Sequence, residues 1–201
     1  MLRLYDYLPS GNGYKVRLLL AKLGIPVELI NLDIVEGATR GADYLAKNPN
    51  GKIPLLELED GTFLAESNAI LFYLADGTAF LPADRLRRAR ALQWMFFEQY
   101  SHEPNIASPR FWMQHAAMTA EREAMLAGKR EAGYAALGVM EKHLGNAVFF
   151  VGGSCSIADI ALYAYTHVAD EGGFDLGAYA SVRAWLDRMA ALPGHIAITQ
   201  G

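Results

Sequence analysis

The chain has 201 residues, of which 52% are hydrophobic and 20% charged, and its formal net charge is −4. This apolar content is sufficient for a folded core and excludes the charge-rich, aromatic-poor composition of a disordered chain. The mildly acidic balance lacks the basic excess that nucleic-acid binding requires, so no nucleic-acid partner is expected. The length suits one large domain or two small ones.

Cys155 is the single cysteine, which excludes an intramolecular disulfide, a CxxC redox pair and a cysteine-rich zinc site. The five histidines show neither HxxxH nor HExxH spacing, so no metal is expected. The start of the chain has no long apolar segment typical of a signal peptide, and no apolar run reaches the ~18 residues that cross a membrane. We therefore expect a cytoplasmic protein without membrane association.

Short β-like runs alternate with helical runs in the first 78 residues. The predicted elements are a strand at 2–5, a helix at 14–23, strands at 27–32, 54–59 and 62–64, and a helix at 67–75. The first three elements have the spacing of a βαβ unit with parallel strands, and Asp60-Gly61 is a strong hairpin signal. The sequence therefore predicts a small α/β domain with the order βαβ-ββα.

The remainder of the chain is helical in pattern. Residues 79–85 have the character of a linker, and residues 86–201 form the predicted all-α domain. Apolar residues recur at three- and four-residue spacing from Leu86 to Tyr100. Three further helices are predicted, at 119–143, 156–168 and 179–191. The fold class is therefore α/β plus all-α.

The segment Ser10-Gly11-Asn12-Gly13 separates the first strand from the first helix. An anion at this place would meet free backbone N–H groups and the positive end of the helix dipole. Dinucleotide binding is excluded because GxGxxG requires glycine where Val16 stands, and a phosphate-binding P-loop is excluded because Gly-Lys-Ser/Thr is absent. Taken alone, the segment is better explained as an ordinary strand-to-helix turn capped by Ser10.

Two other segments carry candidate chemistry. In residues 48–54, a cis Ile53-Pro54 bond would direct the Ile53 backbone N–H and C=O at a groove, ready to pair with an extended peptide. Glu66 and Ser67 begin a helix and offer an anion to an ammonium group and a hydroxyl to a carboxylate. This pair suits the α-amine and α-carboxylate of an amino acid, although an ordinary turn and a simple cap also explain the two segments.

Together with Ser156-Ile157-Ala158-Asp159, which has the pattern of a capping box, these segments make the chain resemble a cytosolic glutathione transferase. The matching pieces run from residue 1 to about 190, and the resemblance is to the bacterial serine-type branch, theta-like or nu-like. It implies a thioredoxin-like N-terminal domain, an all-helical C-terminal domain, a homodimer, and glutathione as co-substrate.

The resemblance also implies residue roles. Ser10 would donate a hydrogen bond to the glutathione sulfur, with Asn12 assisting or replacing it and Tyr5 or Tyr7 as second choices. The remaining glutathione-binding residues that it implies are Thr39, Arg40, Lys52, Ile53, Pro54, Glu66 and Ser67. The second substrate would bind the helical domain at Tyr100, His102, Arg110 and Phe111.

The activity implied by the resemblance is conjugation of the glutathione thiolate to small electrophiles, as in detoxification. Redox members of the family carry cysteine where Ser10 stands, so a protein-thiol mechanism is not expected here. Three alternatives stay open at this point: a glutathione-dependent disulfide reductase or peroxidase, a glutathione-dependent isomerase or dehalogenase, and a non-catalytic glutathione-binding relative.

Overall fold

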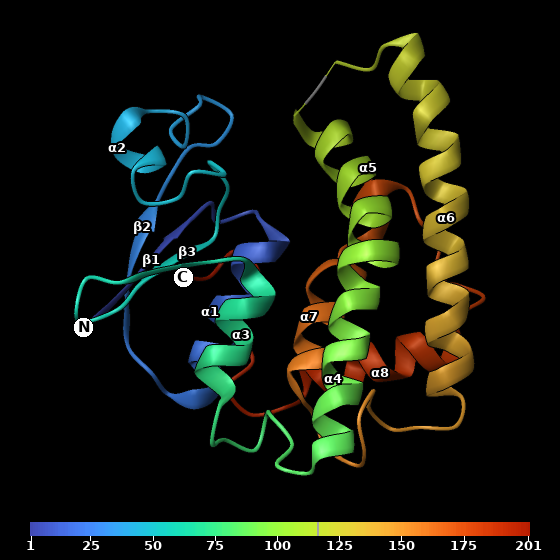
Figure 1. Ribbon diagram of the computed structural model, residues 1–201. Helices are drawn as coiled ribbons and strands as arrows, with labels where there is room; N and C mark the ends of the chain where they lie inside the picture. The colour runs from blue at the N-terminus through green and yellow to red at the C-terminus, as the bar shows by residue number, and fades with distance from the viewer. Residues whose placement is uncertain (116) are drawn as a thin grey trace. The chain divides into compact units, whose positions relative to one another are not determined.

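The structure is a computed structural model that describes residues 1–115 and 117–201. The chain forms two compact units (Figure 1). The first unit comprises residues 1–76 and 193–201, and the second comprises residues 77–192.

A four-stranded sheet with the strand order β2-β1-β3-β4 forms the centre of the first unit. The central strand β1 (Leu2–Asp6) is parallel to β2 (Val27–Asn31) and antiparallel to β3 (Leu55–Glu57). β4 (Phe63–Ala65) pairs antiparallel with β3. The predicted parallel βαβ unit and the predicted hairpin are therefore both confirmed.

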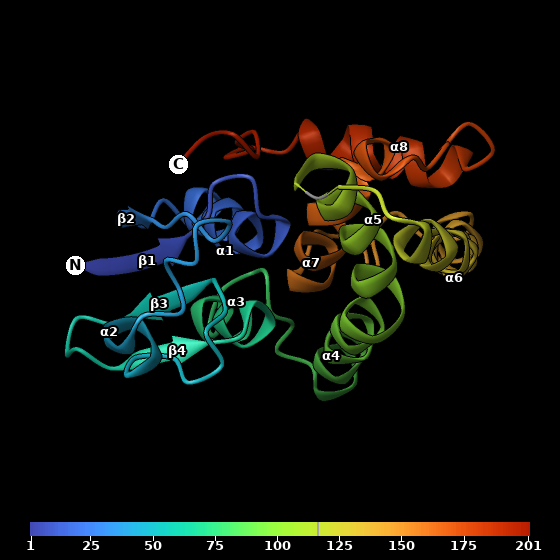
Figure 2. The same ribbon diagram turned by 90° about the horizontal axis from the view of Figure 1, so that it is seen from above.

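Two helices cover one face of this sheet, and a short one lies on the other. α1 (Gly11–Leu23) and α3 (Ser67–Ala75) pack side by side, while α2 (Ala42–Leu45) lies across the sheet from them (Figure 2). α1 ends at Gly24, whose φ of 65° is the left-handed conformation that glycine adopts without strain. The core between the sheet and the two long helices contains Leu4, Leu18, Leu56, Ile70 and Leu71.

The last residues of the chain, 193–201, group with the first unit rather than with the helices that precede them. Side chains of α1 donate hydrogen bonds to backbone carbonyls of this terminal segment. The Tyr14 hydroxyl donates to the Ile196 oxygen at 2.6 Å, and the Arg17 guanidinium donates to the Gln200 oxygen. These bonds join segments far apart in the sequence.

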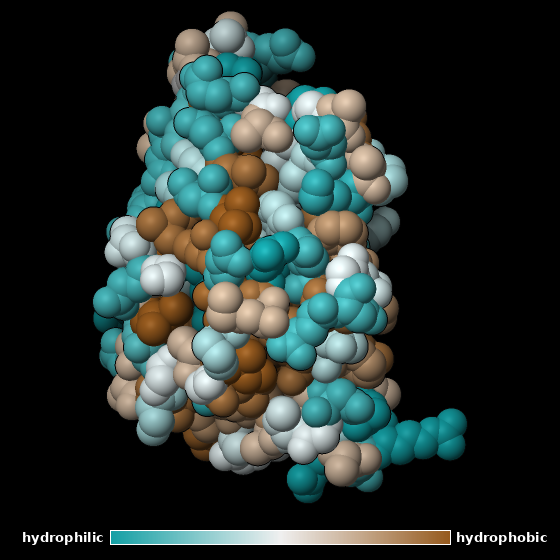
Figure 3. Space-filling view, turned by 90° about the vertical axis from the view of Figure 1, so that its left-hand side faces the viewer, coloured by the Kyte–Doolittle hydropathy of each residue, from teal (hydrophilic) through white to brown (hydrophobic). Residues whose placement is uncertain are grey.

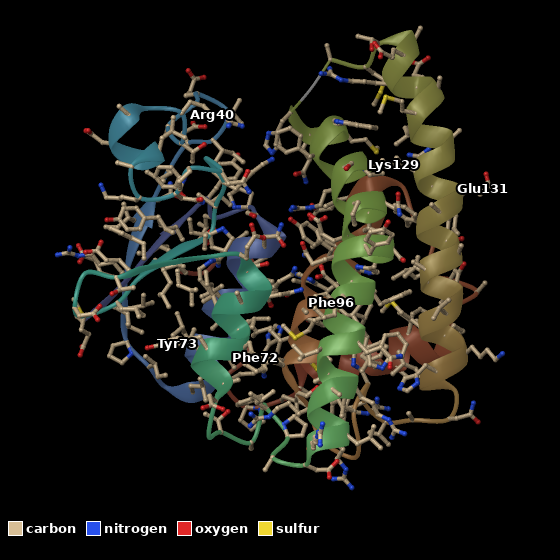
Figure 4. All side chains as sticks on the ribbon, viewed as in Figure 1. Arg40, Phe72, Tyr73, Phe96, Lys129 and Glu131 are labelled. Atoms are coloured by element: carbon tan, nitrogen blue, oxygen red, sulfur yellow. The ribbon has the colours of Figure 1, made fainter. Side chains whose placement is uncertain are left out.

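The second unit is helical in all its described residues, apart from connecting loops and turns. Its helices are α4 (Arg85–Phe97), the π-helical turn η1 (Glu98–His102), α5 (Glu103–His115), α6 (Ala120–Leu144), α7 (Ile157–Thr166), the short 3-10 helix η2 (Ala169–Gly172) and α8 (Ala180–Ala190). α7 is buried along its whole length and packs against α4, α5 and α8. Lys129 on α6 donates from Nζ to the Pro104 oxygen of α5 at 2.8 Å (Figure 4).

The predicted capping box at the start of α7 is present. The Ser156 backbone N–H donates to Asp159 Oδ2 at 2.9 Å, while Phe150 N and Trp185 Nε1 donate to Oδ1 at 3.0 and 3.1 Å. Burial raises the pKa of the Asp159 carboxyl, and these donors oppose the rise. One carboxylate therefore connects α7, α8 and the loop before α7.

Apolar side chains reach the surface in separate places among hydrophilic ones on the face drawn in Figure 3. The large exposed apolar residues include Val35 and Tyr73 in the first unit and Leu86, Phe96 and Met113 in the second. In residues 1–115 and 117–201, the helices are all too short or too polar to span a bilayer.

Candidate functional site

The strand register brings the three sequence motifs to one end of the sheet. Tyr5 of β1 lies opposite Leu55 of β3, so the loop that follows β1 is adjacent to the segment that precedes β3. Leu55 also lies opposite Ala65 at the end of β4, which places the start of α3 at the same end. The motif residues that meet there are Ser10, Ile53 and Ser67.

Ser10 is the N-cap of α1. Its Oγ accepts from the Gly13 backbone N–H at 3.4 Å, and its own N–H donates to the Tyr7 oxygen at 2.7 Å. A hydroxyl has one donor hydrogen and two acceptor lone pairs, and capping uses only a lone pair. Ser10 can therefore cap the helix and donate its hydrogen to an anion at the helix N-terminus.

Gly13 is required by close packing against Asp6, at the end of β1. A Cβ at position 13 would overlap the Asp6 carboxylate, which is fully buried. Arg17 Nε lies 2.8 Å from Asp6 Oδ2, and Arg17 Nη2 donates to the Leu8 oxygen at 2.6 Å. The Tyr7 N–H donates to Asp6 Oδ1 at 2.7 Å, so this buried pair holds the loop before α1. Burial raises the pKa of Asp6 to about 6 although Arg17 opposes the rise.

A second buried polar cluster connects the starts of α1 and α3. Lys15 is 0% exposed, and its Nζ donates to Asn12 Oδ1 at 2.8 Å and to Ser67 Oγ at 3.4 Å. Ser67 Oγ in turn donates to Asn12 Oδ1 at 3.3 Å. The sequence motifs predict roles for Asn12 and Ser67 but none for Lys15. The sequence signal for this role of Lys15 is a positively charged residue inside the apolar run of α1.

The turn before β3 is held by its own side chains. The Ile53-Pro54 bond is cis, as the peptide-pairing hypothesis requires. Asn48, which is buried, donates from Nδ2 to the Lys52 oxygen at 2.8 Å, and the Tyr44 hydroxyl donates to the same oxygen at 2.7 Å. Asn48 and Tyr44 thus fix the turn that presents Ile53, and the sequence motifs predict a role for neither residue.

Thr39 and Arg40 lie against this same turn. A Cβ added at Gly51 would be 3.1 Å from the Thr39 oxygen and 2.9 Å from Arg40 Nη1. Thr39 is buried and Arg40 is exposed, and Figure 4 shows Arg40 on the loop beside α2. The structure therefore brings Thr39 and Arg40 close to the turn that contains Lys52, although the sequence pattern of this loop predicted no element.

Glu66 has a strained backbone at the start of α3. Its φ is 68°, and it is the one non-glycine residue with positive φ within the described ranges. Such a conformation costs on the order of 1–3 kcal/mol and occurs preferentially at functional sites. The Glu66 side chain is exposed and the following residue, Ser67, is buried.

The Tyr5 side chain lies on the face of the sheet that α2 covers, opposite the face covered by α1 and α3. Its hydroxyl donates to Glu57 Oε2 at 2.7 Å, and this bond raises the phenol pKa. Its ring packs edge-on against Tyr44 of α2, with the centroids 6.2 Å apart. A cavity of about 420 Å³ lies on this side; its lining includes Tyr5, Tyr44 and Lys47 but no residue of the three motifs.

The four residues predicted for a second substrate fall into two pairs in the second unit. Tyr100 is 89% exposed and Phe111 is 42% exposed. His102 is fully buried, with Nε2 2.9 Å from Thr166 Oγ1. Arg110 is also buried, and its Nε lies 2.5 Å from Glu171 Oε2. The structure therefore presents Tyr100 and Phe111 at the surface and uses the other two inside the helical unit.

The chemistry of the site in the first unit favours an anionic ligand with a peptide backbone. The starts of α1 and α3 supply N–H groups and helix-dipole ends, and Lys15 supplies a full positive charge. Glu66 offers a carboxylate to an ammonium group. Among the described residues, no group of three or more His, Cys, Asp or Glu side chains is arranged to hold a metal ion.

Comparisons with known proteins agree with this geometry. Residues 1–76 match the family described as "Glutathione S-transferase, N-terminal domain", and residues 94–193 match its C-terminal domain. A solved glutathione S-transferase from Pseudomonas fluorescens is 52% identical, with a TM-score of 0.97 over 99% of each chain. The curated "Disulfide-bond oxidoreductase YfcG" of Escherichia coli is 32% identical over 96% of this chain and 92% of its own.

Among the similar solved structures are complexes with glutathione or its derivatives. The glutathione transferase URE2P6 from Phanerochaete chrysosporium, in complex with oxidized glutathione, is 26% identical to this chain. Its TM-score is 0.85, and the match covers 96% of this chain and 92% of that one.

Proposed function

Because the chain belongs to the glutathione S-transferase family, we propose that it binds glutathione at the end of the sheet and joins the thiolate sulfur of glutathione to a small electrophile. The observation that carries the proposal is Ser10, whose hydroxyl caps α1 where the helix dipole favours an anion. In the reaction, the thiol first loses its proton to solvent. The thiolate then forms a bond to an electrophilic carbon. Either a leaving group departs with the electron pair of its broken bond, or, in conjugate addition, the resulting carbanion takes a proton from solvent.

The need for Ser10 follows from the chemistry of thiols. A free thiol has a pKa of about 8.5, and the thiolate is the nucleophile. Lowering the pKa by 1 requires about 1.36 kcal/mol of preferential stabilisation of the thiolate. A hydroxyl donor at a helix N-terminus can supply this, with the amide of Asn12 as a second donor. Ser10 donates and does not act as a base, because a hydroxyl is too weak to accept the thiol proton.

The rest of the tripeptide would extend along the other two motifs. Glu66 and Ser67 would hold the γ-glutamyl ammonium and carboxylate, and Ile53, preceding Pro54, would pair its backbone with the cysteinyl residue. Lys52 would meet the glycyl carboxylate, with Thr39 and Arg40 nearby. This assignment is supported by the proximity of Thr39 and Arg40 to the turn before β3.

The second substrate would bind the helical unit through exposed aromatic side chains. Tyr100 and Phe111 are the residues proposed to contact it, and the buried His102 and Arg110 would support that surface from within. A homodimer and a cytoplasmic location, both expected from the resemblance and the composition, belong to the same proposal.

Ser10→Ala tests the proposal. We expect the pKa of bound glutathione, measured from thiolate ultraviolet absorbance across pH, to rise by about 1, the size of one lost hydrogen bond to a charged group. Turnover with 1-chloro-2,4-dinitrobenzene, if wild type accepts it, should fall about tenfold below that pKa. Ser154→Ala, at an exposed loop position of the second unit, is the matched control. An unchanged pKa in Ser10→Ala would remove Ser10 from the mechanism and assign its role to Asn12.

Glutathione-dependent disulfide reduction is a second candidate, favoured by the similarity to the oxidoreductase YfcG. Cys155, the single cysteine, is buried in the second unit, so glutathione alone would supply the electrons. Two glutathione molecules would reduce one disulfide to two thiols and leave as glutathione disulfide. Incubation with hydroxyethyl disulfide and glutathione separates the two candidates, because only the reductase raises the rate of disulfide consumption above that of the enzyme-free reaction.

A further inference from the structure

Lys15 is a lysine with no exposed surface, on the helix that begins the proposed glutathione site. Burying an ammonium group is costly unless polar partners compensate it. Its partners include Asn12 and Ser67, which the family resemblance connects to two neighbouring parts of the ligand: the cysteinyl sulfur and the γ-glutamyl group.

The direction of each hydrogen bond fixes the orientation of Asn12. Lys15 Nζ can only donate, so the Asn12 atom at 2.8 Å is the amide oxygen. Ser67 Oγ accepts from Lys15 and donates to the same oxygen at 3.3 Å. With its oxygen directed at the ammonium group, Asn12 turns its amide nitrogen, which is a donor, the other way.

We propose that Lys15 is a positioning residue for glutathione: it holds Asn12 with its amide donor toward the thiolate, and its charge stabilises that thiolate. The inference rests on the proposed function, since it names how that same site is organised. It extends beyond the three motifs, because a buried cation connects the part of the site proposed for the sulfur to the part proposed for the γ-glutamyl group, through Asn12 and Ser67.

A purely structural role for Lys15 makes a different prediction. If its bonds only fasten α1 to α3, then replacing it changes the free energy of unfolding but leaves the bound thiol unaffected. Lys15→Gln separates the roles, because the neutral amide keeps a donor for Asn12 Oδ1 while the charge is lost. Lys15→Met removes both the charge and the donor. Lys22→Met, on the last turn of the same helix, is the matched control.

The experiment measures glutathione KM and the pKa of bound glutathione for the four proteins. For Lys15→Gln we expect the thiol pKa to rise by about 1, the low end of the effect of one nearby opposite charge, with KM within about twofold. For Lys15→Met we expect a similar rise in pKa and a KM about tenfold higher, since the orientation of Asn12 and Ser67 is also lost. Lys22→Met should match wild type in both.

Wild-type thiol pKa in both Lys15 variants, with glutathione bound, would overturn the inference while leaving the proposed function intact. Should Lys15→Met fail to fold, the thiol pKa of Lys15→Gln decides the matter. A wild-type protein that binds no glutathione at millimolar concentration in calorimetry would overturn the proposed function itself, and the role of Lys15 with it.

Discussion

Asp6→Asn isolates the effect of a buried carboxylate that lies behind the site. Burial raises the pKa of Asp6 from 3.8 to about 6, and the Arg17 ion pair only partly opposes it. The folded protein therefore binds the Asp6 proton more tightly than the unfolded chain does. The stability that this group contributes is fully present below pH 4 and is lost as the pH rises through 6.

The size of the effect follows from the two pKa values. Each pKa unit corresponds to about 1.36 kcal/mol, so the whole loss is roughly 3 kcal/mol, of which about 1.3 kcal/mol falls between pH 5 and pH 7. Asparagine does not titrate. The free energy of unfolding of Asp6→Asn, relative to wild type, should therefore increase by about 1.3 kcal/mol from pH 5 to pH 7.

Urea unfolding of both proteins at pH 5 and pH 7 measures this difference. Asp60→Asn is the matched control. Asp60 is exposed in the β3–β4 hairpin, and the Thr62 backbone N–H lowers its pKa. It stays ionised throughout this pH range, so the difference between Asp60→Asn and wild type should be constant. If the Asp6→Asn difference is also constant, then Arg17 outweighs burial and the reasoning is refuted.

Two further predictions concern backbone positions of the site. Gly13→Ala should lower the free energy of unfolding by about 1–3 kcal/mol, because its methyl group must displace the buried Asp6 carboxylate; wild-type stability in urea would contradict this close packing. Glu66→Gly should be more stable than Glu66→Ala by about 1 kcal/mol in urea, because glycine adopts a φ of 68° without strain. Both Glu66 variants should raise glutathione KM about tenfold if the carboxylate holds the γ-glutamyl ammonium, and equal stability of the two would contradict the strain.

The elements that the sequence predicts best are those with local signals. The helix predicted at 67–75 coincides with α3, and the box of Ser156 and Asp159 begins α7 as expected. The Asp60-Gly61 turn joins β3 and β4, with the Thr62 N–H bound to Asp60 Oδ1 at 2.9 Å. Helix caps, turns and apolar periodicity depend on interactions within a few residues. They can therefore be predicted from the sequence before the fold is known.

The start of α1 cannot be predicted from local sequence signals. Glycine and asparagine at residues 11–13 predict a turn and a helix only from Tyr14, but α1 begins at Gly11. The reason is nonlocal: Asp6 occupies the space beside Gly13, and Arg17 binds Asp6. The grouping of residues 193–201 with the first unit has the same kind of cause, since it depends on contacts with α1 made across most of the chain.

The two buried cations of α1 hold the motifs in place, and the motif sequences alone do not predict this role. Lys15 and Arg17 stand in an apolar run, and a helical-face interpretation predicts that such charges reach solvent, yet both are buried. Lys15 binds the start of α3, and Arg17 binds the loop before α1 through Asp6 and the Leu8 oxygen. One turn of helix therefore fixes two of the three motifs. Because each cation needs its partners to remain buried, the position of the motifs and the stability of the unit depend on the same bonds.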